Sequence, residues 1–356
     1  MRAPRLCGEQ VHEGKSGRRG PRTTDSSGCP VCAWRPRRRR KTEYPSGVEF
    51  ARYLVHPERW ERLPADWPGL FGREARLAVE VGFGNGEFLA GASQEHPDWN
   101  WVGFETSLTC IVKAGRKLAR AGAENVRLAR AEGRFALREL FPDETVGRVF
   151  VHFPCPWPKT RHAERRVMDS DFSRTLSAVL TPGGSVELTT DVRAYAQDVG
   201  QVLAAQGFRV VGPAPVDVAG PGTRYEAKWR AQGRGIWRVT ADRGQRGSTL
   251  RTAEGAMPHV RIRSVAKRDA VEQLVGLRES WPGGAFAVQG AFFSPDGRAT
   301  LLRTFASDDG YQQHYLLVVA REQEGTMVKL DGAATPFRTP AVKRSVAAVA
   351  AALEER

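Results

Sequence analysis

The sequence predicts an α/β fold in which a mostly parallel, Rossmann-like sheet is covered by helices on both faces. Between residues 48 and 241, short apolar stretches typical of strands alternate with longer stretches of helical spacing. The first apolar stretch, at 76–81, runs directly into a turn that holds three glycines. Repeated strand–helix units favour parallel pairing, and ligands of such sheets bind beyond the carboxyl ends of the strands.

Seven strands and four helices are expected in this region. The strands are predicted at residues 76–81, 99–104, 125–129, 148–153, 185–190, 208–211 and 236–240. The helices are predicted at residues 88–95, 107–121, 169–180 and 192–206.

The chain is expected to divide into four parts. Residues 1–45 are predicted to be a disordered basic tail, because they are rich in Arg, Gly, Pro and Ser and lack periodic apolar residues. Residues 46–241 hold the sheet, and residues 242–257 are interpreted as a linker. Residues 258–356 are predicted to form a smaller α+β domain, with strands at 260–262, 285–293, 299–305, 314–320 and 327–330 and a helix at about 340–353.

The net charge of +14 favours a polyanionic partner, with nucleic acid as the first candidate. The charge is uneven, because residues 1–41 carry twelve Lys or Arg against three acids and the other 315 residues carry only +5. The basic run at 35–41 is interpreted either as an RNA contact or as a solvated tail.

The five cysteines are too few and too scattered for a disulfide scaffold, which favours a reducing cytoplasm. The pair Cys29 and Cys32 lacks the further ligands that zinc requires, so no metal is expected. There is no run of eighteen apolar residues and no apolar leader at the start, so neither a membrane span nor a signal peptide is expected.

The glycine turn follows a carboxylate, since Glu80 comes just before Gly82, Gly84 and Gly86. Alternate glycines allow a sharp turn and a close approach to a ligand. A dinucleotide site would want a further glycine at position 87, where Glu87 stands, and a carboxylate beside the turn would repel a pyrophosphate. A cationic cofactor without phosphate fits better, and S-adenosylmethionine is such a molecule.

Two further acids follow the next two predicted strands. Glu105 is positioned to accept both ribose hydroxyls of a cofactor, and Glu132 to reach its adenine. The alternative for each carboxylate is a solvated turn residue.

The fourth predicted strand ends in a stiff corner, Pro154-Cys155-Pro156-Trp157-Pro158, followed by a basic run to Arg166. Three prolines fix their φ angles and so present Trp157 rigidly. A rigid aromatic ring beside a basic cluster suits a nucleic-acid base next to its phosphate backbone. The alternative is a buried tryptophan with a solvated charge run.

At these residues the chain resembles the bacterial tRNA (guanine-N7)-methyltransferase family, over roughly residues 70–241. The shared features are the glycine turn, the segment from Pro154 to Arg166, Thr190-Asp191, Thr223 to Glu226, and Gly235 to Trp237. The resemblance implies a seven-stranded class I methyltransferase fold and methylation of guanine 46 in the variable loop of tRNA. It leaves the oligomeric state open between monomer and homodimer.

The resemblance also implies functional residues. Cofactor contacts are expected at Glu80, Gly82, Gly84, Gly86, Glu105, Glu132 and Cys155, and substrate contacts at Lys159, Asp191, Thr223, Arg224, Tyr225 and Glu226. Cys155 is a departure, because the family has an aspartate at this catalytic position and a neutral thiol does not hold negative charge firmly.

N7 of guanine carries a free lone pair and no proton, so its methylation requires no base. Carboxylates near the base would stabilise the cationic product and accept from guanine N1 and N2. Asp191 and Glu226 are predicted to take these roles, with Asp191 as the main catalytic group beside Cys155. The alternatives are helix caps, for Asp191 alone and for Thr223 together with Glu226.

Two other functions fit parts of the sequence. A methyltransferase that acts on protein or on a small molecule would explain the glycine turn but not Pro154 to Arg166. A noncatalytic tRNA-binding protein of the same fold would explain Cys155.

Overall fold

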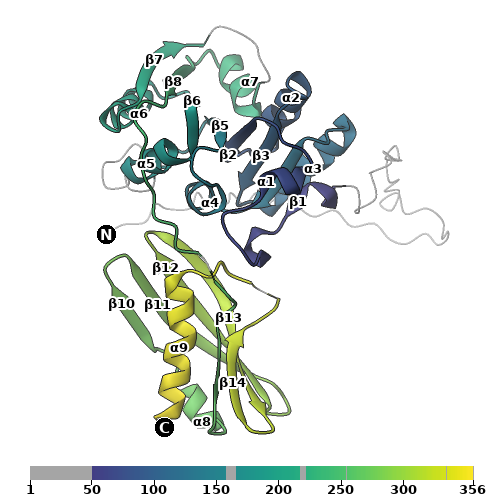
Figure 1. Cartoon of the computed structure of the whole chain (residues 1–356), viewed down its shortest axis with the longest axis vertical. Coiled ribbons are helices and arrows are strands. Elements are labelled where there is room, and N and C mark those ends of the chain that lie inside the picture. Colours follow the sequence, from purple (N-terminus) through teal and green to yellow (C-terminus); the bar gives the residue numbers. More distant parts are fainter. Residues whose placement is uncertain (1–49, 158–165, 217–221, 254, 334, 356) are drawn as a thin grey trace, which may run out of the picture. The chain divides into compact units, whose positions relative to one another are not determined.

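Two β-sheets organise the part of the chain that the structure describes, which is residues 50–356 without 158–165, 217–221, 254, 334 and 356 (Figure 1). The structure is a computed structural model. The predicted tail and Lys159 lie outside the described residues. The larger sheet is built from the first two thirds of the chain, and the smaller sheet from the last third.

The first sheet has eight strands in the order β1-β4-β3-β2-β5-β6-β8-β7. They are β1 (Leu54–Val55), β2 (Leu77–Val81), β3 (Asn100–Glu105), β4 (Val126–Arg130), β5 (Val146–His152), β6 (Leu180–Thr190), β7 (Arg209–Pro215) and β8 (Trp237–Asp242). All neighbours are parallel except β8, which runs antiparallel to both β6 and β7.

The predicted seven strands correspond to β2 through β8, so the predicted fold class is confirmed. The eighth strand, β1, was not predicted, because its two residues are too short to produce an alternating or apolar pattern. The order of the strands reverses between β2 and β5, and this is the switch point at which open α/β sheets bind ligands.

The first sheet is accompanied by seven α-helices in the described residues: α1 (Trp67–Phe71), α2 (Glu87–Glu95), α3 (Leu108–Ala121), α4 (Gly133–Leu140), α5 (Ser170–Val179), α6 (Arg193–Ala205) and α7 (Arg224–Ala231). Short 3-10 helices lie at Ala51–Tyr53 and Pro57–Arg59. Helices α2, α3, α5 and α6 match the four predicted helices to within two residues, whereas α1, α4 and α7 were not predicted.

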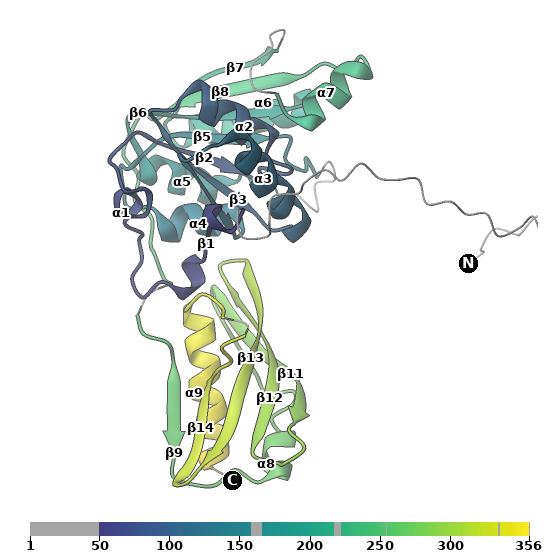
Figure 2. The same ribbon diagram turned by 90° about the vertical axis from the view of Figure 1, so that its right-hand side faces the viewer.

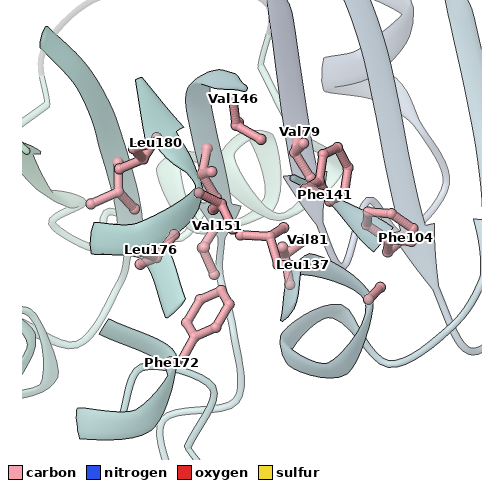
Figure 3. Packing of buried hydrophobic residues seen from close by; sticks show 14 of the residues in the cluster. Val79, Val81, Phe104, Leu137, Phe141, Val146, Val151, Phe172, Leu176 and Leu180 are labelled. Carbon is pink, nitrogen blue, oxygen red and sulfur yellow. The ribbon is translucent and has the colours of Figure 1, made fainter. Parts of the chain in front are cut away.

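The helices cover both faces of the first sheet. On one face, Leu89 of α2 and Leu118 of α3 share an apolar cluster with Ala78 of β2. On the other face, Leu137 of α4 shares a cluster with Val79 of the same strand. The second cluster also takes in Phe172 and Leu176 of α5, and these side chains lie together with those of β2 and β5 (Figure 3). Burial on both faces explains why these strands have continuous apolar sequences.

The second sheet is antiparallel, with the order β10-β11-β12-β13-β14-β9 (Figure 2). Its strands are β9 (His259–Ile262), β10 (Arg278–Trp281), β11 (Gly284–Phe293), β12 (Ala299–Asp308), β13 (Tyr311–Glu322) and β14 (Gly325–Leu330). A short helix, α8 (Arg268–Glu272), precedes β10, and the long closing helix α9 (Pro340–Glu354) packs on one face of the sheet. The buried hydroxyls of Tyr315 and Ser345 meet there at 2.7 Å.

Among the described helices, none has the length and apolar character that a membrane crossing would require.

Candidate active site

The glycine turn and the proline corner follow neighbouring parallel strands. Val81 of β2 is paired with Val151 of β5, so both loops leave the same edge of the sheet. The amide of Gly82 donates to the carbonyl of Phe104 at 2.8 Å, and the amide of Phe153 donates to the carbonyl of Thr189 at 2.7 Å. The two segments that the sequence singled out therefore begin side by side at the switch point.

The three glycines of the turn have positive φ angles of +74° at Gly82, +55° at Gly84 and +73° at Gly86. A Cβ atom added at Gly82 or Gly84 would meet no atom within 4 Å, so open space lies above these two residues. A Cβ atom at Gly86 would approach the Cβ of Ala114 in α3 to 2.6 Å. The first two glycines therefore leave room for a ligand, while the third allows the turn to pack on α3.

Glu80 lies beneath this turn and is almost fully buried, with 1% of its surface exposed. Its Oε1 atom lies 3.0 Å from Nδ1 of His152, at the end of β5. Its Oε2 atom has no hydrogen-bond partner among the described residues. Burial raises the pKa of Glu80, and the hydrogen bond and charge of His152 oppose that rise. His152 was not identified from the sequence, where the only signal is a polar residue at the end of an apolar strand.

Glu105 ends β3 and braces the glycine turn. Its carboxylate accepts from the amide of Gly84 at 3.1 Å, and from the amides of Thr106 and Ser107 at 2.8 and 3.0 Å. The carboxylate thus fixes the turn to the end of the neighbouring strand, which is more than a solvated turn residue would do.

Glu132 is the N-cap of α4. Its side chain accepts from the amides of Arg134 and Phe135 at 3.2 and 2.9 Å, and it forms an ion pair with the Arg134 guanidinium. The interpretation as a solvated turn residue was therefore wrong, because the carboxylate has a capping role. Glu132 also lines a cavity of about 570 Å³ together with Thr106 and Ile111. That volume is in the usual range for small-molecule sites.

Left-handed backbone occurs at Phe153, just before the proline corner, at φ +47° and at Trp157, within it, at φ +40°. Arg166 clamps the corner, since its guanidinium donates to the carbonyls of Pro156 and Trp157 at 3.0 and 3.3 Å. Cys155 is exposed at this corner. Arg166 was predicted to belong to a basic cluster for RNA, whereas in the structure it holds the backbone of the corner.

Asp191 follows β6 and is paired with an arginine of a distant segment. Its Oδ2 atom lies 2.9 Å from Nη1 of Arg234, and its side chain is 14% exposed. Asp191 does not cap the following helix, because the N-cap of α6 is Val192. The alternative role as a helix cap was therefore wrong for this residue.

Thr223 is the N-cap of α7, and its hydroxyl accepts from the amide of Glu226 at 3.1 Å. The Glu226 carboxylate does not complete a capping box, since it pairs with Arg230 at 2.9 Å. The exposed ring of Tyr225 lies 6.2 Å from the ring of Phe153, which brings the start of α7 next to the proline corner. Arg224 at the first position of α7 is exposed.

This edge of the sheet fits a cationic cofactor without phosphate. Open space lies above Gly82 and Gly84, and Glu80 supplies a buried oxygen with no partner among the described residues. A carboxylate lies near the carboxyl end of each of β2, β3 and β4, a charge distribution that suits a sulfonium and an amino group. Within the described part of the chain, no three His, Cys, Asp or Glu side chains gather as a metal site would require.

Comparisons with known proteins agree with this geometry. A family model described as "Putative methyltransferase" matches residues 74–239. The chain is 39% identical over 301 residues to the tRNA (guanine-N(7)-)-methyltransferase of Thermotoga maritima, covering 83% of this chain and 94% of that protein. It is 33% identical over 312 residues to the protein of the same name from Thermus thermophilus, covering 85% and 96% respectively.

Among solved structures, the 16S rRNA methyltransferase KamB is 17% identical with a TM-score of 0.42, covering 51% of this chain and 95% of that one. The extent and identity of the alignments with the two bacterial relatives show that this chain belongs to the tRNA (guanine-N7)-methyltransferase family.

Proposed function

We propose that the protein transfers the methyl group of S-adenosylmethionine to N7 of guanine 46 in the variable loop of tRNA. The observation that carries this proposal is the adjacency of two loops on paired strands β2 and β5. One is the acidic glycine turn, and the other is the proline corner with its aromatic neighbours. A cofactor held by the first loop would face a base held by the second.

The reaction requires guanine N7, the methyl carbon and the sulfur to be aligned. It requires no proton transfer, because N7 carries a lone pair and no proton. When bound, S-adenosylmethionine supplies an electrophilic methyl group on a cationic sulfur. Glu80, the glycine turn and Glu105 would hold that molecule, and Glu132 would border its adenine. The protein's task is to orient the base toward the cofactor, and good orientation alone contributes several kcal/mol.

Asp191 and Glu226 are the proposed contacts to the base. Their carboxylates would accept from N1 and N2 of guanine and stabilise the positive charge that develops on the purine. Each carboxylate forms an ion pair in the structure, with Arg234 and Arg230 respectively, so each is held in one orientation. Lys159, Arg224 and Tyr225 are proposed as further contacts to the RNA.

Cys155 replaces the carboxylate that the family carries at this position. A neutral thiol does not stabilise a cationic purine as a carboxylate does, yet the reaction needs no base at this position. We therefore expect a functional enzyme in which Asp191 carries more of the stabilisation. The replacement favours one second candidate, a tRNA-binding protein of the same fold without catalytic activity.

The chain is proposed to divide into a catalytic domain at 46–241, a connecting segment at 242–257 and a smaller domain at 258–356. Because the proposed substrate is tRNA, we expect the protein to act in the cytoplasm.

The test is incubation of the protein with bulk tRNA and labelled S-adenosylmethionine, followed by nucleoside analysis. 7-Methylguanosine is expected, and its loss in a transcript with G46→A assigns the position. Label in protein or in a small molecule would replace the proposal with the corresponding activity, and tRNA binding without label would support the noncatalytic candidate.

The Asp191→Ala variant is expected to lower kcat by about a hundredfold, the usual effect of removing one group that stabilises transition-state charge. Asp171→Ala, an exposed acid of α5, is the matched control. Full activity of Asp191→Ala would refute the role of this carboxylate.

A further inference from the structure

Arg234 connects the Asp191 carboxylate to a partly buried aromatic residue of α7, Trp229. Its Nη1 atom lies 2.9 Å from Asp191 Oδ2, and its guanidinium carbon lies 4.1 Å from the ring centre of Trp229. The amide of Arg234 donates to the carbonyl of Trp229 at 3.0 Å, after Gly233 has turned the chain at φ +67°. The end of α7 thus fixes this arginine in one place, although its side chain remains 52% exposed.

A second cation packs on the same ring. The Nζ atom of Lys228 lies 4.3 Å from the ring centre of Trp229, and both cations are exposed to solvent. Residues 222–237 contain four Lys or Arg and one acid. Cations that pack on an aromatic face are held by the quadrupole of the ring while their remaining donors point outward.

We propose that Lys228 and Arg234, held on Trp229, form a subsite for a phosphate group of the RNA backbone, and that Arg234 couples this subsite to Asp191. This inference rests on the proposed function, since it assumes that the bound polyanion is the tRNA substrate. The chemical class of the ligand is a phosphodiester, which carries one negative charge and two exposed acceptor oxygens.

The donor geometry of Arg234 supports a phosphodiester. A guanidinium has five N–H donors, and Asp191 occupies one edge of this one. Across the residues described, no other side chain or carbonyl accepts from the Arg234 side chain, so donors remain for a planar, two-point contact of the kind that phosphates receive. Lys228 adds a second charge on the same indole.

The coupling explains how Asp191 can act on a cationic purine although it is already paired. Without RNA, the positive charge of Arg234 offsets the negative charge of Asp191 across 2.9 Å. A phosphate on the other side of the guanidinium offsets that positive charge, so the carboxylate regains its effect on the developing charge of the base. Binding of the backbone and stabilisation of the reacting base are then linked through one side chain.

The experiment compares Lys228→Gln and Arg234→Gln with Arg209→Gln in the full-length protein. Arg209 is an exposed arginine at the start of β7, where it pairs with Asp242 at the end of β8. The proposed site lies near the other end of these two strands, so Arg209 is the matched control. Binding of bulk tRNA is measured by filter retention at several salt concentrations. Binding of S-adenosylmethionine is measured by calorimetry, and the melting temperature of each variant reports its folding.

Lys228→Gln and Arg234→Gln are each expected to weaken tRNA binding by several-fold and to reduce the salt slope by about one ion per lost phosphate contact. Cofactor affinity and melting temperature should stay at the wild-type values, and Arg209→Gln should bind tRNA as the wild type does. Wild-type affinity and salt slope in both variants would overturn the subsite.

Arg234→Lys tests the coupling, because a lysine keeps the charge but loses the planar fork that reaches Asp191. It is expected to bind tRNA with a nearly normal salt slope and, because Asp191 is then no longer held in one orientation, to lower kcat at saturating tRNA by about tenfold. An unchanged kcat would refute the coupling. If the wild-type protein binds tRNA without methylating it, the proposed function fails, whereas the binding data still decide the subsite.

Discussion

At the scale of single residues, Glu80 opposes the stability of the fold that contains it. Burial raises the pKa of its carboxyl above the ordinary value of 4.5, despite the hydrogen bond from His152. A carboxyl with a raised pKa favours folding fully below its unfolded pKa, and that contribution is lost as the pH rises through the folded pKa. At neutral pH the buried charge of Glu80 therefore lowers the stability of the fold, and a bound cationic ligand would offset this effect.

Glu80→Gln is expected to raise the melting temperature at pH 8 by about 2–4 °C, the shift that 1 kcal/mol produces in a domain of this size. The gain should shrink as the pH falls below 4.5, because Glu80 then becomes protonated in the unfolded state as well. The same variant should bind S-adenosylmethionine at least tenfold more weakly, a loss of about 1.4 kcal/mol. Thermal denaturation across pH and calorimetry measure both effects, with the exposed Glu95→Gln as control. Equal stability of variant and wild type at pH 8 would contradict this account.

Cys155 is a position at which a substitution should raise the rate of methyl transfer. A carboxylate at this exposed corner would stabilise the cationic purine better than a thiol does, so Cys155→Asp is expected to raise kcat about tenfold. Cys155→Ser, which is neutral and of similar size, should leave the rate near that of the wild type. Steady-state methylation of tRNA at saturating cofactor checks both variants. A slower Cys155→Asp enzyme would show that the corner is adapted to the thiol.

At the scale of elements, α7 is unusual because none of its residues is buried. It is held at its start by the Thr223 cap and at its end by the turn through Gly233. A helix of eight residues without packing has little stability of its own. The cap therefore decides how well this part of the proposed RNA site is ordered.

Thr223→Ala is expected to remove about 1 kcal/mol from α7, the usual worth of such a cap. Amides of residues 224–231 should exchange faster with solvent, and the KM for tRNA should rise several-fold while cofactor affinity stays unchanged. Thr223→Ser retains the hydroxyl and should behave as the wild type. Amide hydrogen exchange and steady-state kinetics are measured for both variants and the wild type. Unchanged amide exchange in Thr223→Ala would show that α7 does not depend on its cap.

The elements that the sequence predicted best are those with a buried apolar pattern, such as the central strands and α3. Helix α7 was indicated only by the alternative interpretation of Thr223 and Glu226 as a helix cap, because a helix without a buried face has no apolar periodicity. Helix α4 was not predicted, although the carboxylate of Glu132, which the sequence indicated as a cofactor contact, begins that helix as its cap.

The proposed site was predictable in part, for a similar reason. Strand ends can be found from apolar patterns, so the positions of Glu105 and Asp191 at the sheet edge followed from the sequence. Their partners did not, because His152 and Arg234 come from segments distant in sequence and no periodicity relates them. Pairwise geometry of this kind depends on the tertiary fold.

At the scale of the whole molecule, the start of β13 contacts α4, the helix that Glu132 caps. The ring of Tyr311 stacks on Phe135 of α4, with ring centres 3.7 Å apart and planes 13° apart. The ring centre of Phe337 lies 4.9 Å from that of Phe135 and 6.2 Å from that of Tyr311. Burial raises the pKa of Tyr311, as expected for a phenol removed from water.

Tyr311→Ala is expected to lower the free energy of unfolding by about 2 kcal/mol, less than for a fully buried aromatic residue. The lost contact borders the cavity beside Glu132, so the affinity for S-adenosylmethionine should also fall. Tyr311→Phe keeps the stack and serves as the control. Urea denaturation and calorimetry give the two values. Unchanged cofactor affinity in Tyr311→Ala would show that the stack of Tyr311 on Phe135 does not contribute to cofactor binding in the cavity.

The order of the strands has a consequence for how such a protein can change its target. Adjacent strands lie about 4.8 Å apart, so the strand ends form a row of evenly spaced positions. The row reads Glu132, Glu105 and Glu80 on one side of the switch point, then Cys155 and Asp191 on the other. In the proposed site, the residues for the methyl donor and those for its acceptor therefore lie on separate, contiguous stretches of chain. Exchange of the second stretch between relatives should alter the choice of nucleic acid while the donor is retained.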